Sequence, residues 1–318
     1  MTRIGQNPAK FVKDVAKPAR ITVAVLNYIP FLSGFYAEMG DVLKACLHSI
    51  YQTKIDEEFD ILVFDNGSCD DIKQFLLKEQ AEGRIQYLIF SEKNLGKGGA
   101  WNQIFEGAPG EIIAYTDNDC FFTPDWLANS LKILETYPNV GMVTARPFRT
   151  NEELYTATLN WARENKDVTL EEGDLIPYEV FREFDLSLGQ SEEEISDHYA
   201  RTTDHRLTYQ GVSAMVGASH WQFTAYKEKL LEFVPFRMDR PMGQVRQLDT
   251  RMNEKGYLRL MTEKPCAMNM SNTLDNSVVV AEKQETVTTK NSFAEIPFVK
   301  KTLLGIYNRI FHLYYDKR

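Results

Sequence analysis

Two aspartates, Asp117 and Asp119, follow the apolar run at residues 111–116 and are well suited to chemistry. Side chains of an extended chain alternate between its faces, so we expect these two carboxylates to point the same way, with Asn118 opposite. Adjacent carboxylates repel each other unless a cation lies beside them. Mg²⁺ or Mn²⁺ suits such oxygen ligands and is commonly held by one or two carboxylates and substrate phosphates. The alternative is a polar turn in which Asp119 caps a backbone amide. Because a buried strand precedes the pair, we favour the metal site.

Three other predicted strands also end in polar residues. Ligands of open parallel sheets bind beyond the carboxyl ends of the strands, so these segments are expected to share one binding edge. They are residues 27–28 (Asn-Tyr), 65–68 (Asp-Asn-Gly-Ser) and 94–99 (Asn-Leu-Gly-Lys-Gly-Gly). In the last segment, backbone N–H groups and Lys97 could face an anion. The alternative is a helix-entry turn that needs glycine for a positive φ.

The elements that would position these residues alternate between strands and helices, which predicts an α/β fold. A mainly parallel central sheet with helices on both faces follows from that order. Strands are expected at 21–26, 59–64, 85–90, 111–116, 213–225 and 257–262, and helices at 41–51, 70–78, 97–105, 124–136, 228–233 and 247–255.

The charge of the chain is uneven. It has 36 basic and 45 acidic residues, a net charge of −9. Residues 151–210 contain 15 acidic and 5 basic residues, which is a net charge of −10. The absence of a broad basic stripe disfavours nucleic-acid binding. We expect residues 151–210 to be a mostly helical acidic insertion that either covers the acceptor side of a site or presents a solvated helical face.

Cysteine usage and apolar segments indicate a cytoplasmic protein. The four cysteines are far apart and form no C-x-x-C pair, which argues against a zinc site and a disulfide scaffold. No apolar run approaches the ~20 residues that span a bilayer, and the first ten residues lack the apolar core of a signal peptide. Residues 302–314 predict an amphipathic helix that lies on the inner face of a membrane, or packs on the core or on another subunit in a homo-oligomer.

Absent motifs exclude several enzyme classes. The first strand is not followed by G-x-G-x-x-G, so a Rossmann dehydrogenase is disfavoured. No Ser or Thr follows Lys97, so the glycine-rich segment is not a P-loop. G-x-S-x-G is absent, which argues against an α/β-hydrolase.

Residues 21–138, and more loosely residues 217–257, resemble the family 2 glycosyltransferases, enzymes of the A-type glycosyltransferase fold. Three motifs carry the resemblance: the segment 65–68, Asn94-x-Gly96-x-x-x-Ala100-x-Asn102, and Asp117-x-Asp119. The resemblance implies a Rossmann-like α/β fold and transfer of a sugar from a nucleoside diphosphate, with a UDP-sugar as the favoured donor. A carbohydrate, lipid-linked or protein acceptor and an Mn²⁺ or Mg²⁺ cofactor are also implied.

The resemblance assigns roles to matching positions. Asp119 would hold the metal on the diphosphate, with Asp117 and Asn269 as further ligands. Asp249 would be the catalytic base, with Asp239 as the second candidate; the alternative is that Asp249 is a surface carboxylate paired with Arg246 or Arg251. The nucleotide-sugar site would comprise Asn27, Tyr28, Asp65, Asn66, Asn94, Gly96, Lys97, Asn102, Asp117, Asn118, Gly217, His220 and Trp221.

The sequence also departs from the family pattern. The acidic pair often found near the later helix is missing, and Asn269 stands where some relatives have a metal-binding histidine. We expect an inverting transferase, and keep as alternatives a retaining transferase and a catalytically silent protein that binds nucleotide-sugar or a partner. The expected organisation is a nucleotide-sugar-binding half (1–150), the acidic insertion (151–210), an acceptor-side half (211–275) and a C-terminal extension (276–318).

Overall fold

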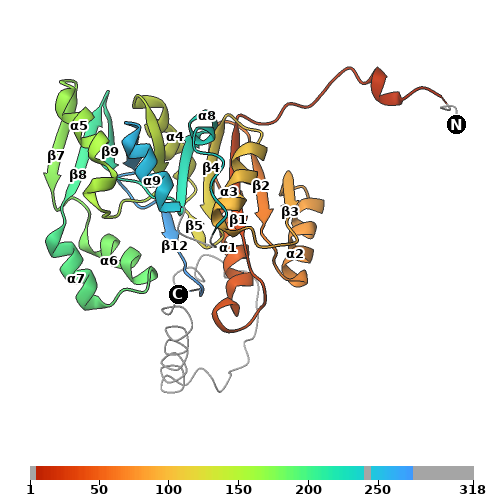
Figure 1. The fold of residues 1–318 in the computed structure, drawn as a ribbon, viewed down its shortest axis with the longest axis horizontal. Helices are drawn as coiled ribbons and strands as arrows, with labels where there is room; N and C mark the ends of the chain where they lie inside the picture. The colour runs from red at the N-terminus through yellow and green to blue at the C-terminus, as the bar shows by residue number, and fades with distance from the viewer. Residues whose placement is uncertain (1–4, 240–244, 275–318) are drawn as a thin grey trace. The chain divides into compact units, whose positions relative to one another are not determined.

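The computed structural model describes residues 5–239 and 245–274, and in this part of the chain a ten-stranded sheet forms the framework. The first four strands in spatial order are β3 (Tyr87–Phe90), β2 (Phe59–Asp65), β1 (Ile21–Asn27) and β4 (Ile112–Asp117), and they run parallel (Figure 1). All residues of β1 are buried, as its near-continuous apolar run predicts for a strand covered on both faces. The α/β class with a parallel sheet is therefore confirmed.

Beyond β4 the sheet becomes mixed. The remaining order is β10 (Gln222–Tyr226), β6 (Val140–Thr144), β11 (Leu258–Met261), β9 (Val212–Val216), β8 (Asp204–Tyr209) and β7 (Val168–Gly173). Only β6 and β11 pair in parallel here. The expected single strand at 213–225 was wrong: it is two strands, β9 and β10, with different neighbours. Gly217, at a φ of +121°, lies in the break between them.

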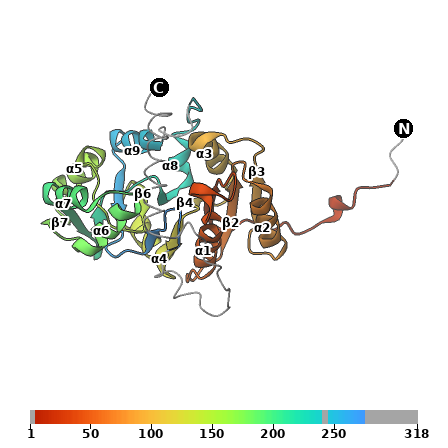
Figure 2. The ribbon, with the colours of Figure 1, turned by 90° about the horizontal axis from the view of Figure 1, so that it is seen from below.

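Helices cover both faces of this sheet. The chain forms α1 (Met39–Tyr51), α2 (Asp70–Ala81), α3 (Gly96–Gly107), α4 (Trp126–Thr136), α8 (Lys227–Leu231) and α9 (Val245–Glu254), with 3₁₀ turns at Pro8–Phe11 and Gly34–Tyr36. Figure 2 shows α3 and α9 on one face and α1 and α4 on the other. One core cluster joins α3, α8 and α9 to the sheet through residues such as Trp101, Leu230 and Leu248. This arrangement matches the predicted order of helices and strands.

The acidic segment 151–210 contains more β-structure than we expected. It forms a 3₁₀ turn (Glu152–Leu154), α5 (Thr156–Glu164), β7, α6 (Tyr178–Ser187), α7 (Glu192–Arg201) and β8. The strands β7 and β8 extend the central sheet to its edge, which the prediction of a mostly helical insertion missed. None of the residues of β7 is fully buried, and an edge strand with acidic residues lacks the strong apolar pattern from which a strand is predicted.

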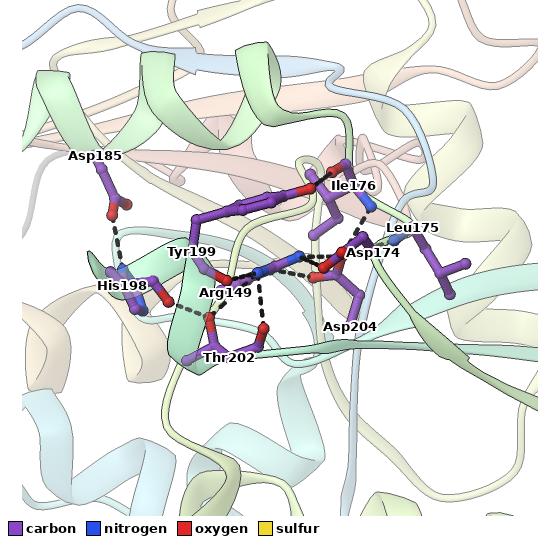
Figure 3. Close-up of polar contacts among 9 residues, drawn as sticks. All are labelled: Arg149, Asp174, Leu175, Ile176, Asp185, His198, Tyr199, Thr202 and Asp204. Atoms are coloured by element: carbon purple, nitrogen blue, oxygen red, sulfur yellow. Dashed lines mark hydrogen bonds and ion pairs between the residues drawn. The ribbon is translucent and has the colours of Figure 1, made fainter. Parts of the chain in front are cut away.

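A buried arginine ties this segment to the rest of the fold. The Arg149 guanidinium donates two hydrogen bonds to Asp204, from Nε at 2.8 Å and from Nη2 at 2.9 Å (Figure 3). It also donates to the carbonyl oxygens of Tyr199 and Thr202 and lies 3.8 Å from the centre of the Tyr199 ring. The side chains of Arg149 and Asp204 are each 1% exposed. Segment 151–210 is therefore anchored through a charged network whose central pair, Arg149 and Asp204, is buried.

We expect Arg149→Ala to destabilise the protein by about 3–5 kcal/mol, because it leaves the Asp204 carboxylate buried and unpaired. Chemical denaturation should show this as a lower midpoint. Arg182→Ala is the matched control, because it removes an exposed ion pair with Glu192 on the same segment and should leave the midpoint unchanged. Equal midpoints for the two variants would contradict the anchoring role.

A second, small sheet lies beside the carboxyl end of β4. It pairs β5 (Cys120–Phe122) with β12 (Ala267–Asn269) in antiparallel fashion, so that Asn269 is opposite Cys120. The predicted amphipathic helix at 302–314 lies outside the described residues. Within the described part of the chain, every helix is too short or too polar to cross a membrane.

Candidate active site

The parallel register brings polar strand ends to one edge of the sheet. Asn27, the last residue of β1, is paired with Asp65 at the end of β2, and the neighbouring Leu26 is paired with Asp117 at the end of β4. Residues far apart in the sequence thus converge where ligands of open parallel sheets bind.

A buried amide network links three of these ends. Asn27 Nδ2 donates to Asp65 Oδ2 at 2.7 Å and to Ser68 Oγ at 3.0 Å, while Asn118 Nδ2 donates to Asn27 Oδ1 at 2.7 Å. Asp65 Oδ1 also accepts the backbone N–H of Ser68 at 2.9 Å, and Asp65 is fully buried. These contacts fix the loops after β1, β2 and β4 relative to one another at this edge of the sheet.

The glycine-rich segment is a capped helix entry. Gly96 has a φ of +68°, and its N–H donates to Asn94 Oδ1 at 2.7 Å. Asn66 Oδ1 accepts the N–H of Leu95 at 2.9 Å, and Asn66 Nδ2 donates to Asn94 Oδ1 at 3.0 Å. Side-chain oxygens therefore accept the N–H groups of Leu95 and Gly96, where the chain enters α3. Gly96 thus has the positive φ that the helix-entry alternative requires, and anion binding by this segment stays a prediction.

Asp117 lies between a cation and a phenol. Lys97 Nζ is 2.6 Å from Asp117 Oδ2, and the Tyr115 hydroxyl donates to Asp117 Oδ1 at 2.6 Å. Burial, together with the negative charge of Asp117, raises the pKa of Tyr115 well above its ordinary value, so the phenol keeps its proton. Tyr115 and Asp117 are two residues apart on one strand and share a face. Lys97 thus supplies positive charge beside the carboxylate pair.

Asp119 has the electrostatics of a cation ligand. Burial and the neighbouring charge of Asp117 raise the pKa of Asp119 to about 7. A divalent cation would relieve this repulsion, so the donor set fits the metal that the sequence predicts. Asn118 and Asp119 lie in the turn between β4 and β5, so the alternation of an extended chain does not apply to them as we had assumed.

The predicted third ligand lies near this pair in the fold. The backbone N–H of Met270 donates to the Asp119 carbonyl at 2.7 Å, which places β12 beside the turn. Asn269 Oδ1 accepts the N–H of Ser271 at 2.9 Å. Within residues 5–239 and 245–274, no group of three or more His, Cys, Asp or Glu side chains could hold a metal. A cation here would depend on two carboxylates together with ligand and water oxygens.

Asp249, the predicted base, is held by two partners. Its Oδ1 accepts from Arg259 Nη2 at 2.7 Å, and its Oδ2 is 2.6 Å from His220 Nδ1. Asp249 is 2% exposed and Arg259 is fully buried, which excludes the alternative of a surface carboxylate paired with Arg246 or Arg251. Burial lowers the pKa of Arg259, whereas Asp249 raises it. Asp249 is therefore an internal carboxylate that contacts His220, whose side chain is 26% exposed.

The segment before β10 connects this cluster to the aspartate pair. The backbone N–H of Asp117 donates to the Trp221 carbonyl at 3.0 Å, and the His220 ring lies 6.5 Å from the Trp101 ring. Trp221 packs on Phe184 of α6, with ring centroids 5.4 Å apart. Segment 151–210 therefore packs against Trp221, and its expected role of covering the acceptor side stays a prediction.

The other predicted residues have clear positions. Asn102 exchanges two hydrogen bonds with the backbone of Phe236 and so fixes the loop after α8. Tyr28 packs edge-on against Tyr36. Gly217 is tightly enclosed, because a Cβ there would lie 3.0 Å from Met261 Cε. Asp239 is exposed, at the end of the first described range.

Two residues at the site were missed by sequence reasoning. Arg259 is a lone cation within the apolar strand β11, a pattern that signals a buried charged contact. Tyr115 is two residues before Asp117, so its place on the same face could have been inferred from strand geometry.

Comparison with known proteins shows which family this chain resembles. Residues 34–184 match the model of glycosyl transferase family 2, which confirms the resemblance found in the sequence. The chain is 32% identical to an uncharacterized glycosyltransferase of Nostoc sp. over 127 residues, which are 39% of this chain and 35% of that protein. It is 28% identical to glycosyltransferase AglE of Haloferax volcanii over 138 residues, 39% of this chain and 45% of that protein.

Further matches are more distant. The succinoglycan biosynthesis protein ExoW of Rhizobium meliloti is 28% identical over 105 residues, which cover 32% of this chain and 33% of that protein. The chain thus spans between a third and less than half of the length of these three curated relatives. Among solved structures, a mannosyltransferase of Pyrobaculum calidifontis in complex with GDP-Man and Mn²⁺ has a TM-score of 0.46 at 20% identity, over 78% of this chain and 57% of that one.

Proposed function

We propose that this protein is a metal-dependent glycosyltransferase that moves a sugar from a nucleoside diphosphate, with a UDP-sugar as the favoured donor, to an acceptor hydroxyl. The observation that carries the proposal is the aspartate pair Asp117 and Asp119 at the carboxyl end of β4. It lies within the segment that matches glycosyl transferase family 2. The raised pKa of Asp119 supports a site that gains from a bound cation.

Asp119 and Asp117 would hold Mn²⁺ or Mg²⁺, with Asn269 close by on β12. The ion would supply Lewis-acid stabilisation of the charge that develops on the departing diphosphate. Lys97 would add a second positive charge at the same place, since its ammonium group already lies 2.6 Å from Asp117. Asn27, Asp65 and Asn118 would keep the nucleotide end of the site in shape through their buried hydrogen bonds.

The acceptor would enter on the side of Trp221 and segment 151–210. A group on that side takes the proton of the acceptor hydroxyl as the new glycosidic bond forms, and attack from the face opposite the leaving group inverts the anomeric centre. Asp249 is the first carboxylate candidate for this acid–base function, either directly or through a group that it contacts, and the exposed Asp239 is the second candidate. The net charge of −10 on segment 151–210 suits a neutral or basic acceptor, whether carbohydrate, lipid-linked or protein. A cytoplasmic location follows from the cysteine pattern.

Donor binding is the direct test of this proposal. We expect one or more of a panel of UDP-, GDP- and dTDP-sugars to raise the melting temperature by a few degrees when Mn²⁺ is present, because a ligand that binds only the native state stabilises it by about 2.7 kcal/mol at a hundredfold excess over its Kd. Excess EDTA should remove the shift. A melting temperature that no donor changes, with or without Mn²⁺, would contradict the proposed function.

A further inference from the structure

The two oxygens of Asp249 are both engaged inside the protein. Oδ1 accepts from the buried guanidinium of Arg259 at 2.7 Å, and Oδ2 is 2.6 Å from His220 Nδ1. Arg259 also donates to the carbonyl oxygens of Ala218 and Leu154, so it is fixed from several directions. An acceptor hydroxyl could reach the Asp249 carboxylate only by displacing one of these partners, since Asp249 is 2% exposed.

His220 is more accessible than the carboxylate that it contacts. Its side chain is 26% exposed, against 3% for that of Asp249. A neutral imidazole carries its proton on one nitrogen only, and a carboxylate at Nδ1 selects the form with Nδ1–H. The lone pair then lies on Nε2, the nitrogen that can accept a proton. This tautomer is assigned from the hydrogen bond.

The surroundings of His220 place it beside the proposed donor site. It lies two residues before Gln222, which pairs with Thr116 of β4, the residue before Asp117. The adjacent Trp221 accepts the backbone N–H of Asp117. Its charged partner is Asp249 on α9, which is paired with Arg259 of β11. The Trp101 ring, 6.5 Å from the His220 ring, also lies 5.7 Å from Nζ of Lys97 on α3, and Lys97 is paired with Asp117 at the end of β4.

We propose that His220 is the catalytic base of this enzyme, and that Asp249 is a positioning residue that acts through it. The inference rests on the proposed glycosyltransferase function. The acceptor O–H bond breaks, and its proton moves to Nε2 of His220, as the acceptor oxygen forms its bond to the anomeric carbon. The bond from that carbon to the diphosphate oxygen breaks, and its electron pair leaves with the nucleoside diphosphate. Asp249 stabilises the resulting imidazolium and keeps the ring oriented.

The experiment measures release of nucleoside diphosphate, with Mn²⁺, from UDP-glucose, UDP-N-acetylglucosamine, GDP-mannose and dTDP-glucose, using methyl glycosides or water as acceptors. We expect His220→Gln to lower kcat by about 10²–10⁴-fold, the usual contribution of a general base, with the donor KM changed less than threefold. Imidazole added to His220→Ala should restore part of kcat. Asp249→Asn should also lower kcat at constant KM.

A double variant separates positioning from a merely structural role. If Asp249 acts only through His220, the kcat of His220→Gln combined with Asp249→Asn should equal that of His220→Gln alone. Thermal melting of each variant checks its fold. Asp249→Asn could unfold the protein, because it leaves the charge of Arg259 buried and unpaired. In that case His220→Gln alone still tests the inference.

The chain contains a matched control for this pair. His198 Nδ1 lies 2.8 Å from the buried Asp185, with side-chain exposures of 32% and 2%, on α7 and α6 (Figure 3). His198→Gln removes the same kind of contact and should leave kcat unchanged. Two outcomes would overturn this inference without touching the proposed function. One is a His220→Gln enzyme whose kcat is within threefold of wild type. The other is a double variant in which Asp249→Asn lowers kcat, relative to His220→Gln alone, by as much as it does in the wild-type background. A wild-type protein that turns over none of these donors overturns the proposed function and the inference with it.

Discussion

Asp119→Ala is expected to abolish sugar transfer and Mn²⁺-dependent donor binding together. The side chain is half-buried at the turn after β4, and Asp117 is the only other carboxylate that we assign to the cation. With no third acidic, His or Cys ligand grouped there among the described residues, removal of Asp119 would leave a single carboxylate for the ion. Titration calorimetry with Mn²⁺ and donor, beside a turnover assay, measures both losses.

Glu111→Ala is a suitable control for this experiment. Glu111 is exposed and immediately precedes β4, at the end of the strand opposite to Asp117, so its loss changes net charge by the same amount without touching the site. Its donor binding should equal that of wild type. Wild-type turnover that survives excess EDTA, or an Asp119→Ala enzyme that still binds donor through Mn²⁺, would argue against the metal assignment.

The part of the fold that holds the proposed donor site could be predicted directly from the sequence. β1, β2 and β4 are apolar runs, each ending in Asn or Asp, and each is followed by a polar turn. Parallel strands joined by helices must present these ends at one edge. Asn27, Asp65 and Asp117 were therefore predictable as neighbours without any contact information.

The contact between His220 and Asp249 could not be predicted in the same way. His220 and Asp249 are 29 residues apart, and they meet only because β10 lies between β4 and β6 while α9 packs on the same face as α3. The sequence around Asp249 gives little indication that this residue is buried, because an acidic residue in a charged helix is normally predicted to be exposed to solvent. Asp249 lies on helix α9, but its charged partner Arg259 belongs to strand β11. Pairing between distant elements, which local patterns do not encode, decides the chemistry here.

Lys97→Met should lower kcat/KM for the donor by about 10–100-fold, the range expected for loss of a charged hydrogen bond. The Lys97 ammonium group is 2.6 Å from Asp117 Oδ2 and its side chain is 12% exposed, so it lies inside the site. Methionine keeps much of the apolar stem that packs near Trp101 and removes only the charge. A donor with two phosphates would lose a cation that Mn²⁺ alone does not replace.

A Mn²⁺ titration distinguishes the role of Lys97 from that of the two aspartates. The positive charge of Lys97 offsets the repulsion between the carboxylates of Asp117 and Asp119. Lys97→Met leaves more negative charge at this place, which attracts a cation. We therefore expect that the affinity of this variant for Mn²⁺ in the absence of donor, measured at pH 8, is not lower than that of wild type. Asp119→Ala should lose that binding, which gives the two variants opposite signatures in a Mn²⁺ titration. Lys93→Met, an exposed lysine in the loop before α3, is the matched control and should behave as wild type. If Lys97→Met keeps a wild-type kcat/KM, the ammonium group serves only to neutralise Asp117 in the donor-free protein and plays no part in holding the diphosphate.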